Sequence, residues 1–215
     1  MRSSKMRIGI LGTGNMAEAL GGQWARAGHE VRVGGRSAEQ AAALAERIGG
    51  SAGSLAEVAA FGEVLLLALP YDAVPAVLAE VGPLRDQVVI DCTNPLVPGS
   101  FTLKTDGLSA AEQFAAQAPG ARVVKAFNLC HVDVWRMTPP IFAGRPLAVP
   151  LCGDAAAVAE VVPLVEALGC HPITAGALDR AGLLEATAAF VIGMWFAGED
   201  SQAVFPPMEF AQGAA

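Results

Sequence analysis

The sequence predicts an α/β protein in which a doubly wound, mostly parallel sheet is followed by a long C-terminal helix. Short runs rich in Val, Ile and Leu alternate with longer segments rich in Ala, Leu and Glu, as strands and helices do in such a sheet. Apolar residues make up 53% of the 215 residues and charged residues only 16%, which excludes a disordered chain. Strands buried on both faces, or a subunit that covers more surface in an oligomer, would explain this high apolar share.

The first elements follow one another with clear boundaries. A strand is expected over residues 7–11, and the helix over residues 15–27 ends at Gly28. A second strand over residues 30–34 leads to a helix over residues 38–48, which two glycines terminate. Glycine commonly ends helices because it adopts the left-handed conformation without strain.

The remaining elements continue the alternation. Further strands are expected over residues 63–69, 88–92, 122–127, 147–152 and 171–174. Further helices are expected over residues 55–60, 73–81, 109–117, 155–168 and 181–196. Residues 1–215 then form one structural domain, with a core over 6–150, a sheet extension and terminal helix over 151–197, and a loop or arm over 198–215.

Charge and cysteine content restrict the partners and the compartment. The net charge of −7 opposes binding to nucleic acid and to anionic lipid, so we expect neither nucleic acid nor a membrane as partner. No apolar run reaches the roughly 18 residues of a membrane span, which favours a cytoplasmic protein. The four cysteines form no CxxC pair and lie near no His cluster, so we expect free, buried thiols and no metal site.

A glycine-rich turn joins the first strand to the first helix. The motif G-x-G-x-x-A runs from Gly12 through Gly14 to Ala17. Gly12 permits the tight turn, Gly14 lets a pyrophosphate approach the backbone, and Ala17 allows close packing of helix and strand. Free amides at the helix N-terminus attract the phosphates. Because strand, helix and spacing agree, the sequence predicts a dinucleotide site.

The end of the second strand distinguishes between the two nicotinamide cofactors. NAD-specific units carry an acidic residue there, whereas this chain reads V-G-G-R-S, with Gly35, Arg36 and Ser37. No carboxylate repels a 2′-phosphate, and the Arg36 guanidinium can bind one as a planar fork. The hydroxyl of Ser37 adds a further donor. The sequence therefore predicts NADP(H).

Three loops at the carboxyl ends of later strands are expected beside the nicotinamide. They contain Leu69 and Pro70, Asn94, and Asn128. Each Asn side chain could bind a carboxamide or a ribose, although Asn also commonly forms turns. His131, which follows Asn128 closely, is the best-placed group for proton transfer, and it is our one candidate catalytic residue.

Seven segments together resemble the F420-dependent NADP oxidoreductase family, whose members reduce coenzyme F420 with NADPH. The matching segments are residues 8–16, 28–37, 67–70, 91–96, 123–128, 149–154 and 175–185. The resemblance implies a Rossmann-type subunit, hydride transfer between the nicotinamide and a deazaflavin, and a homodimer formed through the C-terminal helix. It also implies that the adenosine and phosphates contact Thr13, Gly14, Asn15, Met16, Gly35 and Arg36. Leu69, Asn94 and Asn128 would then lie near the nicotinamide.

Other functions fit the same residues. The hydride acceptor could be a flavin, or a small imine or ketone, because the string G-T-G-N-M-A-E-A-L also resembles the start of pyrroline-5-carboxylate reductases. In that case His131, Asp133 or Tyr71 would donate the proton. The chain could instead be a non-catalytic NADP-binding module. In every case the apolar residues of the helix over 181–196 favour a partner surface, most simply a second copy of the chain.

Overall fold

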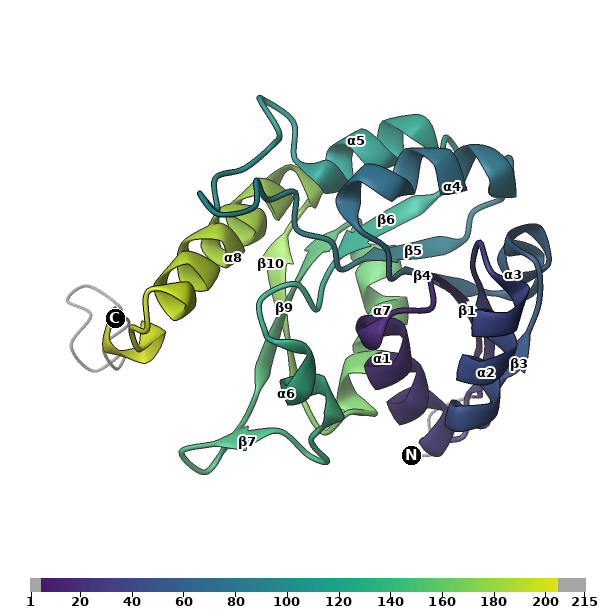
Figure 1. The fold of residues 1–215 in the computed structure, drawn as a ribbon, viewed down its shortest axis with the longest axis horizontal. Coiled ribbons are helices and arrows are strands. Elements are labelled where there is room, and N and C mark those ends of the chain that lie inside the picture. The colour runs from purple at the N-terminus through teal and green to yellow at the C-terminus, as the bar shows by residue number, and fades with distance from the viewer. Residues whose placement is uncertain (1–4, 205–215) are drawn as a thin grey trace.

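The computed structural model describes residues 5–204 and shows a twisted sheet with helices on both faces (Figure 1). The sheet contains β1 (Arg7–Leu11), β2 (Glu30–Gly34), β3 (Ser51–Ala52), β4 (Val64–Leu67), β5 (Val88–Asp91), β6 (Arg122–Lys125), β9 (Ala148–Gly153) and β10 (His171–Gly176). A separate hairpin pairs β7 (Ile141–Phe142) with β8 (Arg145–Pro146).

The helices alternate with the strands, as expected. They are α1 (Asn15–Arg26), α2 (Ala38–Ile48), α3 (Leu55–Phe61), α4 (Val74–Val81), α5 (Ala110–Gln117), α6 (Val132–Arg136), α7 (Ala155–Glu166) and α8 (Ala181–Phe196). Residues 5–204 also contain three short 3-10 helices, which are η1 (Tyr71–Ala73), η2 (Leu178–Arg180) and η3 (Ser201–Val204).

The strand order confirms the predicted doubly wound sheet. It reads β10-β9-β6-β5-β4-β1-β2-β3, and every neighbouring pair is parallel except β6 and β9. The chain builds outward from β1 to β3, then crosses back to place β4 on the other side of β1. Ligands of such sheets bind in the crevice where the order reverses, which here lies at the carboxyl ends of β1 and β4.

Each face of the sheet has its own apolar core. Along β4, Val64 and Leu66 belong to the core beneath α1 and α7, while Leu65 and Leu67 belong to the core beneath α3, α4 and α5. All four side chains have no exposed surface. Because successive side chains point to opposite faces of the sheet, β4 contributes apolar side chains to both cores and contains no polar residue. This is typical of a central parallel strand.

The structure departs from the predicted elements in several places. Strand β3, helix α6 and the β7–β8 hairpin were not predicted, because all of them are short and the hairpin contains Gly and Pro. The expected strands over 63–69 and 122–127 stop at Leu67 and Lys125, and the last strand continues to Gly176. The tail forms η3 within residues 198–204, and residues 205–215 lie outside the described part. The division into a core over 6–150 and an extension stays a prediction.

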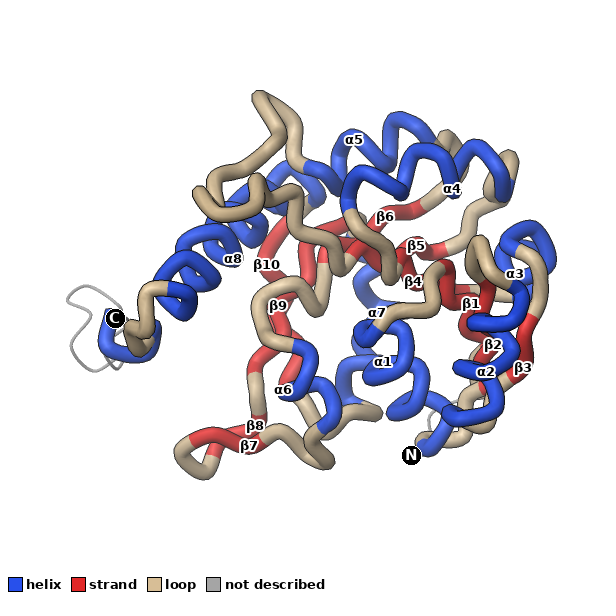
Figure 2. Tube along the Cα trace, in the orientation of Figure 1, coloured by secondary structure: helices blue, strands red, loops and turns tan. Residues whose placement is uncertain are grey.

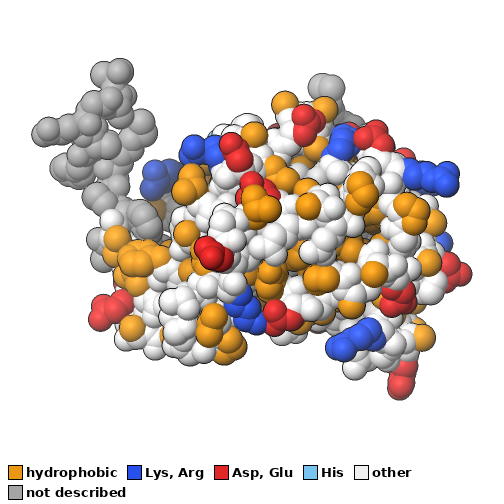
Figure 3. All heavy atoms as spheres, turned by 90° about the horizontal axis from the view of Figure 1, so that it is seen from above, with side chains coloured by type: hydrophobic (Ala, Val, Ile, Leu, Met, Phe, Trp, Pro, Cys, Tyr) orange, Lys and Arg blue, Asp and Glu red, His pale blue; other side chains and the backbone are white. Residues whose placement is uncertain are grey.

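Helix α8 extends away from the body of the molecule (Figures 1 and 2). Ala181, Ala188 and Val191 are buried, whereas Phe190 and Phe196 are 53% and 76% exposed. Apolar side chains also gather at the left end of the molecule in Figure 3, the end at which α8 lies in Figure 1. An apolar patch of this kind is typical of an interaction surface. Within residues 5–204, no helix combines the length and the apolar character needed to cross a membrane.

A buried histidine connects the beginnings of β1 and β2, and it predicts a pH dependence of stability. His29 is 7% exposed, and its Nδ1 accepts a hydrogen bond from Met6 N at 3.2 Å. Burial lowers the pKa of His29. In the unfolded chain the histidine side chain binds a proton with a pKa of about 6.5. In the folded protein His29 binds this proton only at a lower pH. This contribution to stability is therefore present above that pH and is lost as the pH falls through the folded-state pKa.

We expect the urea midpoint of the wild type to fall between about pH 7.5 and pH 5, and to fall less in His29→Gln. Urea unfolding followed by circular dichroism at several pH values measures both. Identical pH profiles for the two proteins would show that His29 does not contribute.

Candidate functional site

The glycine turn after β1 has a geometry that only glycine can adopt. Gly12 has a φ of +128°, and a Cβ atom there would lie 2.1 Å from the carbonyl oxygen of Ala68. Its amide donates to Gly34 O at 2.8 Å, which holds the turn against β2. At Gly14 a Cβ would meet nothing within 4 Å, so the backbone at the start of α1 faces open space. This is the cradle that a pyrophosphate needs.

The N-terminus of α1 offers its amides to a ligand. No side chain caps this helix at Gly14, whereas Ser37, Ser54 and Ser109 cap α2, α3 and α5. The first amides of a helix have no partner within the helix and attract anions. The α1 terminus therefore fits phosphate groups, in agreement with the motif.

A cleft of about 840 Å³ opens above this turn, within the range of about 300–1,000 Å³ that is typical of ligand sites. Its lining includes seven of the predicted cofactor residues, namely Gly12, Thr13, Gly14, Arg36, Ser37, Leu69 and Pro70. Gln40, Leu55, Ala68, Asp72, Ala73, Ala76, Val77 and Glu80 complete it. We call this the glycine-loop cleft.

Arg36 is exposed at the edge of the glycine-loop cleft and forms no ion pair within residues 5–204. Its guanidinium is thus available to an anion at the end of β2. The hydroxyl of Ser37 accepts a hydrogen bond from Gln40 N at 3.2 Å as the cap of α2. Ser37 therefore has a structural task in addition to the predicted contact.

A second cleft of about 330 Å³ lies past the ends of β5 and β6. It is lined by Met16, Cys92, Asn94, Phe127, Asn128, Leu129, Cys130, His131, Val132, Ile192, Trp195 and Phe196. Most of these side chains are apolar, and three come from the outer end of α8. We call it the α8 cleft. Met16, in the first turn of α1, connects it to the glycine turn.

Asn94 and Asn128 form a reciprocal pair at the α8 cleft. Asn94 Nδ2 donates to Asn128 O at 2.8 Å, and Asn128 Nδ2 donates to Asn94 Oδ1 at 3.0 Å and to Leu184 O at 3.2 Å. Asn128 Oδ1 and the neighbouring Thr93 Oγ1 are buried and have no hydrogen-bond partner in the described part of the chain. Buried polar atoms are rarely left unpaired, so this edge fits a ligand that donates hydrogen bonds.

Phe127 turns the chain sharply between β6 and Asn128. Its φ of +62° is a left-handed conformation that bulky residues rarely adopt. The ring packs edge-on against Trp24 at 5.9 Å and against Trp135 at 5.4 Å. Strain of this kind persists only where the surroundings fix it, and it is concentrated at functional sites.

The candidate proton donors are placed differently from one another. His131 caps α6, its Nδ1 lies 3.3 Å from Asp133 Oδ2, and its side chain is 66% exposed. The Tyr71 hydroxyl donates to Gln113 Oε1 at 2.8 Å and lines neither cleft. Only His131 therefore reaches the α8 cleft among these three residues, and it does so from the solvent side.

The structure places the remaining predicted residues as follows. Met16, Asn94, Asn128 and His131 line the α8 cleft rather than the glycine-loop cleft. Asn15 and Gly35 line neither, although a Cβ at Gly35 would lie 2.8 Å from Thr13 Cγ2. That each of them contacts a cofactor stays a prediction.

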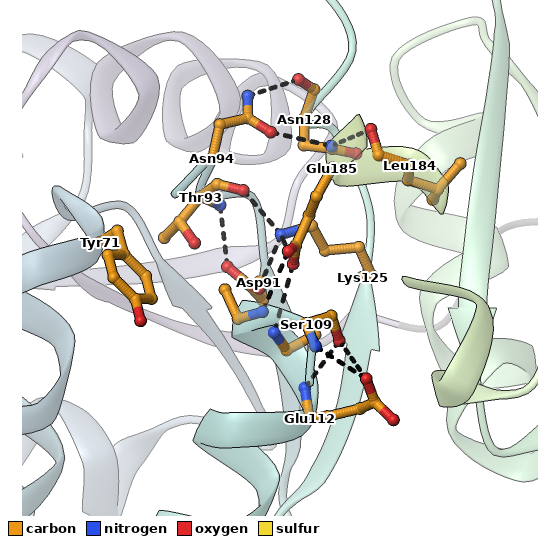
Figure 4. A network of polar contacts seen from close by, with 12 residues as sticks. Tyr71, Asp91, Thr93, Asn94, Ser109, Glu112, Lys125, Asn128, Leu184 and Glu185 are labelled. Carbon is orange, nitrogen blue, oxygen red and sulfur yellow. Dashed lines mark hydrogen bonds and ion pairs between the residues drawn. The ribbon is translucent and has the colours of Figure 1, made fainter. Parts of the chain in front are cut away.

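Sequence reasoning missed a buried ion-pair network beside the asparagine pair (Figure 4). Lys125, at the end of β6, bonds the carboxylates of Asp91 on β5 and Glu185 on α8, and all three side chains have no exposed surface. Burial by itself lowers the pKa of Lys125, but the two carboxylates outweigh it and raise this pKa. A lysine within an apolar strand, in register with an aspartate on the next strand, was the available signal.

The cysteine thiols are expected to be unreactive in the folded protein. Burial raises the pKa of Cys92 to about 12 and those of Cys130 and Cys170 to about 11. Because the thiolate is the reactive species, a disulfide reagent at about pH 8 should label the folded protein slowly and all four thiols after unfolding. Absorbance of the released thiol measures this, and rapid native labelling of Cys130, which lines the α8 cleft, would contradict it.

Comparison with known proteins agrees with this geometry. A model of the family "NADP oxidoreductase coenzyme F420-dependent" matches residues 7–95. The F420-dependent NADP reductase of Methanothermobacter marburgensis is 30% identical over 211 residues, which cover 88% of this chain and 92% of the relative. The metalloreductase STEAP3 of Rattus norvegicus is 26% identical, and the match covers 88% of this chain but only 38% of that longer protein.

Solved structures show the same fold. A candidate F420-dependent NADP reductase from Arthrobacter sp. FB24 superposes with a TM-score of 0.80 at 30% identity, covering 90% of this chain and 96% of the other. A reductive aminase of Aspergillus terreus, solved with NADPH and ethyl levulinate, gives a TM-score of 0.69 at 23% identity, covering 91% of this chain and 63% of the other. The glycine turn, the length of the match and the identity together place this chain in the family of coenzyme F420-dependent NADP oxidoreductases.

Proposed function

We propose that this protein transfers a hydride between NADP(H) and a flat heteroaromatic acceptor, most simply coenzyme F420 or a flavin. The observation that carries the proposal is that the start of α1 contributes to both clefts, since Gly14 lines the first and Met16 lines the second. One has the turn and the arginine that suit the adenosine and phosphates. The other is mainly apolar and contains a pair of asparagines.

The glycine-loop cleft would hold the adenosine half of NADP(H). The amides at the start of α1 bind the pyrophosphate, and Gly14 leaves room for it. Arg36 would bind the 2′-phosphate, because it forms no ion pair in the described part of the chain and no carboxylate stands at the end of β2. Leu69 and Pro70 line the cleft just after the end of β4.

The α8 cleft would hold the nicotinamide and the acceptor. The bound cofactor supplies the hydride, so the chain has to bring two rings together and exclude water. Asn94 and Asn128 orient the carboxamide at the cleft, and Trp195 and Phe196 wall the side toward α8. Hydride addition to a flavin or deazaflavin ring is completed by uptake of one proton at a ring nitrogen, which water or the exposed His131 can supply without a buried acid.

An acceptor screen tests this function. The protein is titrated with NADPH and NADH, and oxidation of NADPH is then followed at the nicotinamide absorbance band with F420, FMN and a cyclic imine. We expect tighter binding of NADPH and oxidation with F420 or FMN. Binding of NADPH without oxidation by any acceptor would favour a non-catalytic module instead.

A reductase for small imines or ketones is the second candidate function. The small volume and apolar lining of the α8 cleft favour it, as does the position of His131 at its rim. Such a substrate needs a proton as well as a hydride. Turnover of the imine that is lost in His131→Ala, with NADPH binding intact, would support this alternative over ring-to-ring transfer.

We also propose that two copies of the chain associate through α8. Phe190 and Leu183 are 53% and 55% exposed on this helix, and apolar area of this kind favours association. Phe190→Glu should halve the mass measured by light scattering. Phe142→Glu, at an exposed Phe of the β7–β8 hairpin, is the control and should leave the mass unchanged. A wild type that already has the mass of one 22.0 kDa chain would refute the proposal.

A further inference from the structure

The ion-pair network under the α8 cleft joins three parts of the fold at one ammonium group. Lys125 Nζ donates to Asp91 Oδ2 at 2.9 Å, to Glu185 Oε1 at 2.8 Å and to the carbonyl of Thr93 at 2.6 Å. These three bonds use all the protons of the ammonium. Lys125 therefore ties β6 to β5, to the loop after β5 and to α8.

The network fixes the backbone that presents Asn94. Thr93 donates through its amide to Asp91 Oδ1 at 2.8 Å and accepts through its carbonyl from Lys125. Thr93, the residue before Asn94, is thus held through both its amide and its carbonyl group. Because Asn94 pairs with Asn128, the position of the pair depends on these contacts.

Glu185 connects the same network to two helices. Its Oε2 accepts from Ala110 N at 3.0 Å and its Oε1 from Ala111 N at 3.3 Å, at the start of α5. The neighbouring carbonyl of Leu184 accepts from Asn128 Nδ2. One turn of α8 therefore holds the first amides of α5, the ammonium of Lys125 and the side chain of Asn128 (Figure 4).

The charges in this network do not balance by themselves. Two carboxylates surround one ammonium, and none of the three side chains is exposed. The excess negative charge faces the N-terminus of α5, where free amides and the helix dipole favour it. A buried ion-pair network contributes little net stability, because removing the charges from water costs free energy. It does fix the relative positions of the elements, because each donor and acceptor is satisfied in only one arrangement.

We infer that Lys125 and Glu185 are positioning residues for the nicotinamide end of the cofactor, acting through the Asn94–Asn128 pair. The inference rests on the proposed function, which places the nicotinamide at that pair. A substitution in the network should then weaken the binding of ligands that carry a nicotinamide. It should leave unchanged the binding of ligands that occupy only the glycine-loop cleft.

The test compares binding of NADP⁺ with binding of 2′,5′-ADP, which lacks the nicotinamide half, by calorimetry on folded protein. In Glu185→Gln the side chain has a single acceptor oxygen, so its amide group must face either Lys125 Nζ or Ala110 N, both of which are donors. We expect NADP⁺ to bind about tenfold more weakly and 2′,5′-ADP to bind unchanged. Asp91→Asn disturbs the network from β5 and should give the same pattern if Glu185→Gln does not fold.

Glu112→Gln is the matched control. Glu112 also stands at the start of α5, but its Oε2 alone accepts from Ser109 N and Ser109 Oγ, which a glutamine oxygen can replace. It has no contact with Lys125 in the described structure. Both ligands should bind this variant as they bind the wild type.

A double variant tests whether Glu185 acts through the asparagine pair. Asn128→Ala should weaken the binding of NADP⁺ but not that of 2′,5′-ADP. Adding Glu185→Gln should weaken NADP⁺ binding no further, because the effects of residues that act as one unit are not additive. Equal losses for both ligands in Glu185→Gln, no loss, or a multiplied loss in the double variant would overturn the inference. Failure of the proposed function differs: the wild type would not bind NADP⁺, or Asn128→Ala would bind it normally.

Discussion

Lys125→Met is expected to lower the free energy of unfolding by about 3–5 kcal/mol. The substitution keeps most of the aliphatic length but leaves the carboxylates of Asp91 and Glu185 buried without a cation. Removing one partner of a buried ion pair costs this much because an uncompensated charge remains in an apolar interior. Urea unfolding followed by circular dichroism measures the change, provided that the slope of the transition is unchanged.

Two comparisons separate this effect from a general loss of lysine. Lys5→Met removes an exposed ion pair with Glu30 and should leave the transition where it is, because exposed pairs contribute little. The triple variant Lys125→Met, Asp91→Asn and Glu185→Gln removes the charges together and should regain part of the loss. A midpoint for Lys125→Met equal to that of Lys5→Met would show that the ammonium does not compensate the carboxylates.

Arg36→Ala is expected to weaken binding of NADPH by about 10–100-fold, the usual range for losing charge-assisted hydrogen bonds to a phosphate. Binding of NADH, which lacks the 2′-phosphate, should not change. The reason is the position of Arg36 at the rim of the glycine-loop cleft without an ion pair in the described chain. Fluorescence titration with both cofactors gives the two dissociation constants.

Arg47→Ala serves as the control for Arg36. Arg47 lies in the last turn of α2, the helix that follows Arg36, but its guanidinium pairs with Glu18 at 3.0 Å and it does not line the glycine-loop cleft. Cofactor binding should be that of the wild type. If Arg36→Ala weakened NADH and NADPH equally, Arg36 would contact a group common to both cofactors, and NADP selectivity would need another origin.

The elements that sequence reasoning placed correctly are those with strong local signals. Helix α2 begins after Ser37, which caps it, and ends at Gly49 in the left-handed conformation. Its predicted bounds of 38–48 match the structure because both ends are specified by neighbouring residues. The existence of strand β4 was also predicted, from a run of apolar residues without helical periodicity, although the predicted range of 63–69 extended beyond both ends of the strand. The glycine turn belongs to this group, and its geometry follows from Gly12 alone.

What sequence reasoning missed depends on residues that are far apart in the chain. Asp91, Lys125 and Glu185 are separated by 34 and 60 residues, and each is unremarkable in its own segment. Only the register between β5 and β6, and the return of the chain through an antiparallel strand, bring them together. Helix α6 was missed for a different reason, because a helix of 5 residues is too short to show a period.

The contacts at Glu185 have a mechanical consequence for α8. The helix is held near its first turns, and its outer end supplies Trp195 and Phe196 to the α8 cleft. From Glu185 to Phe196 the helix spans about 16 Å, so a tilt of about 5° at the held end moves the far end by about 1.4 Å. Any small rotation of α8 near Lys125 would therefore become a larger displacement at Trp195 and Phe196, and would change the width of the cleft where two rings would have to meet.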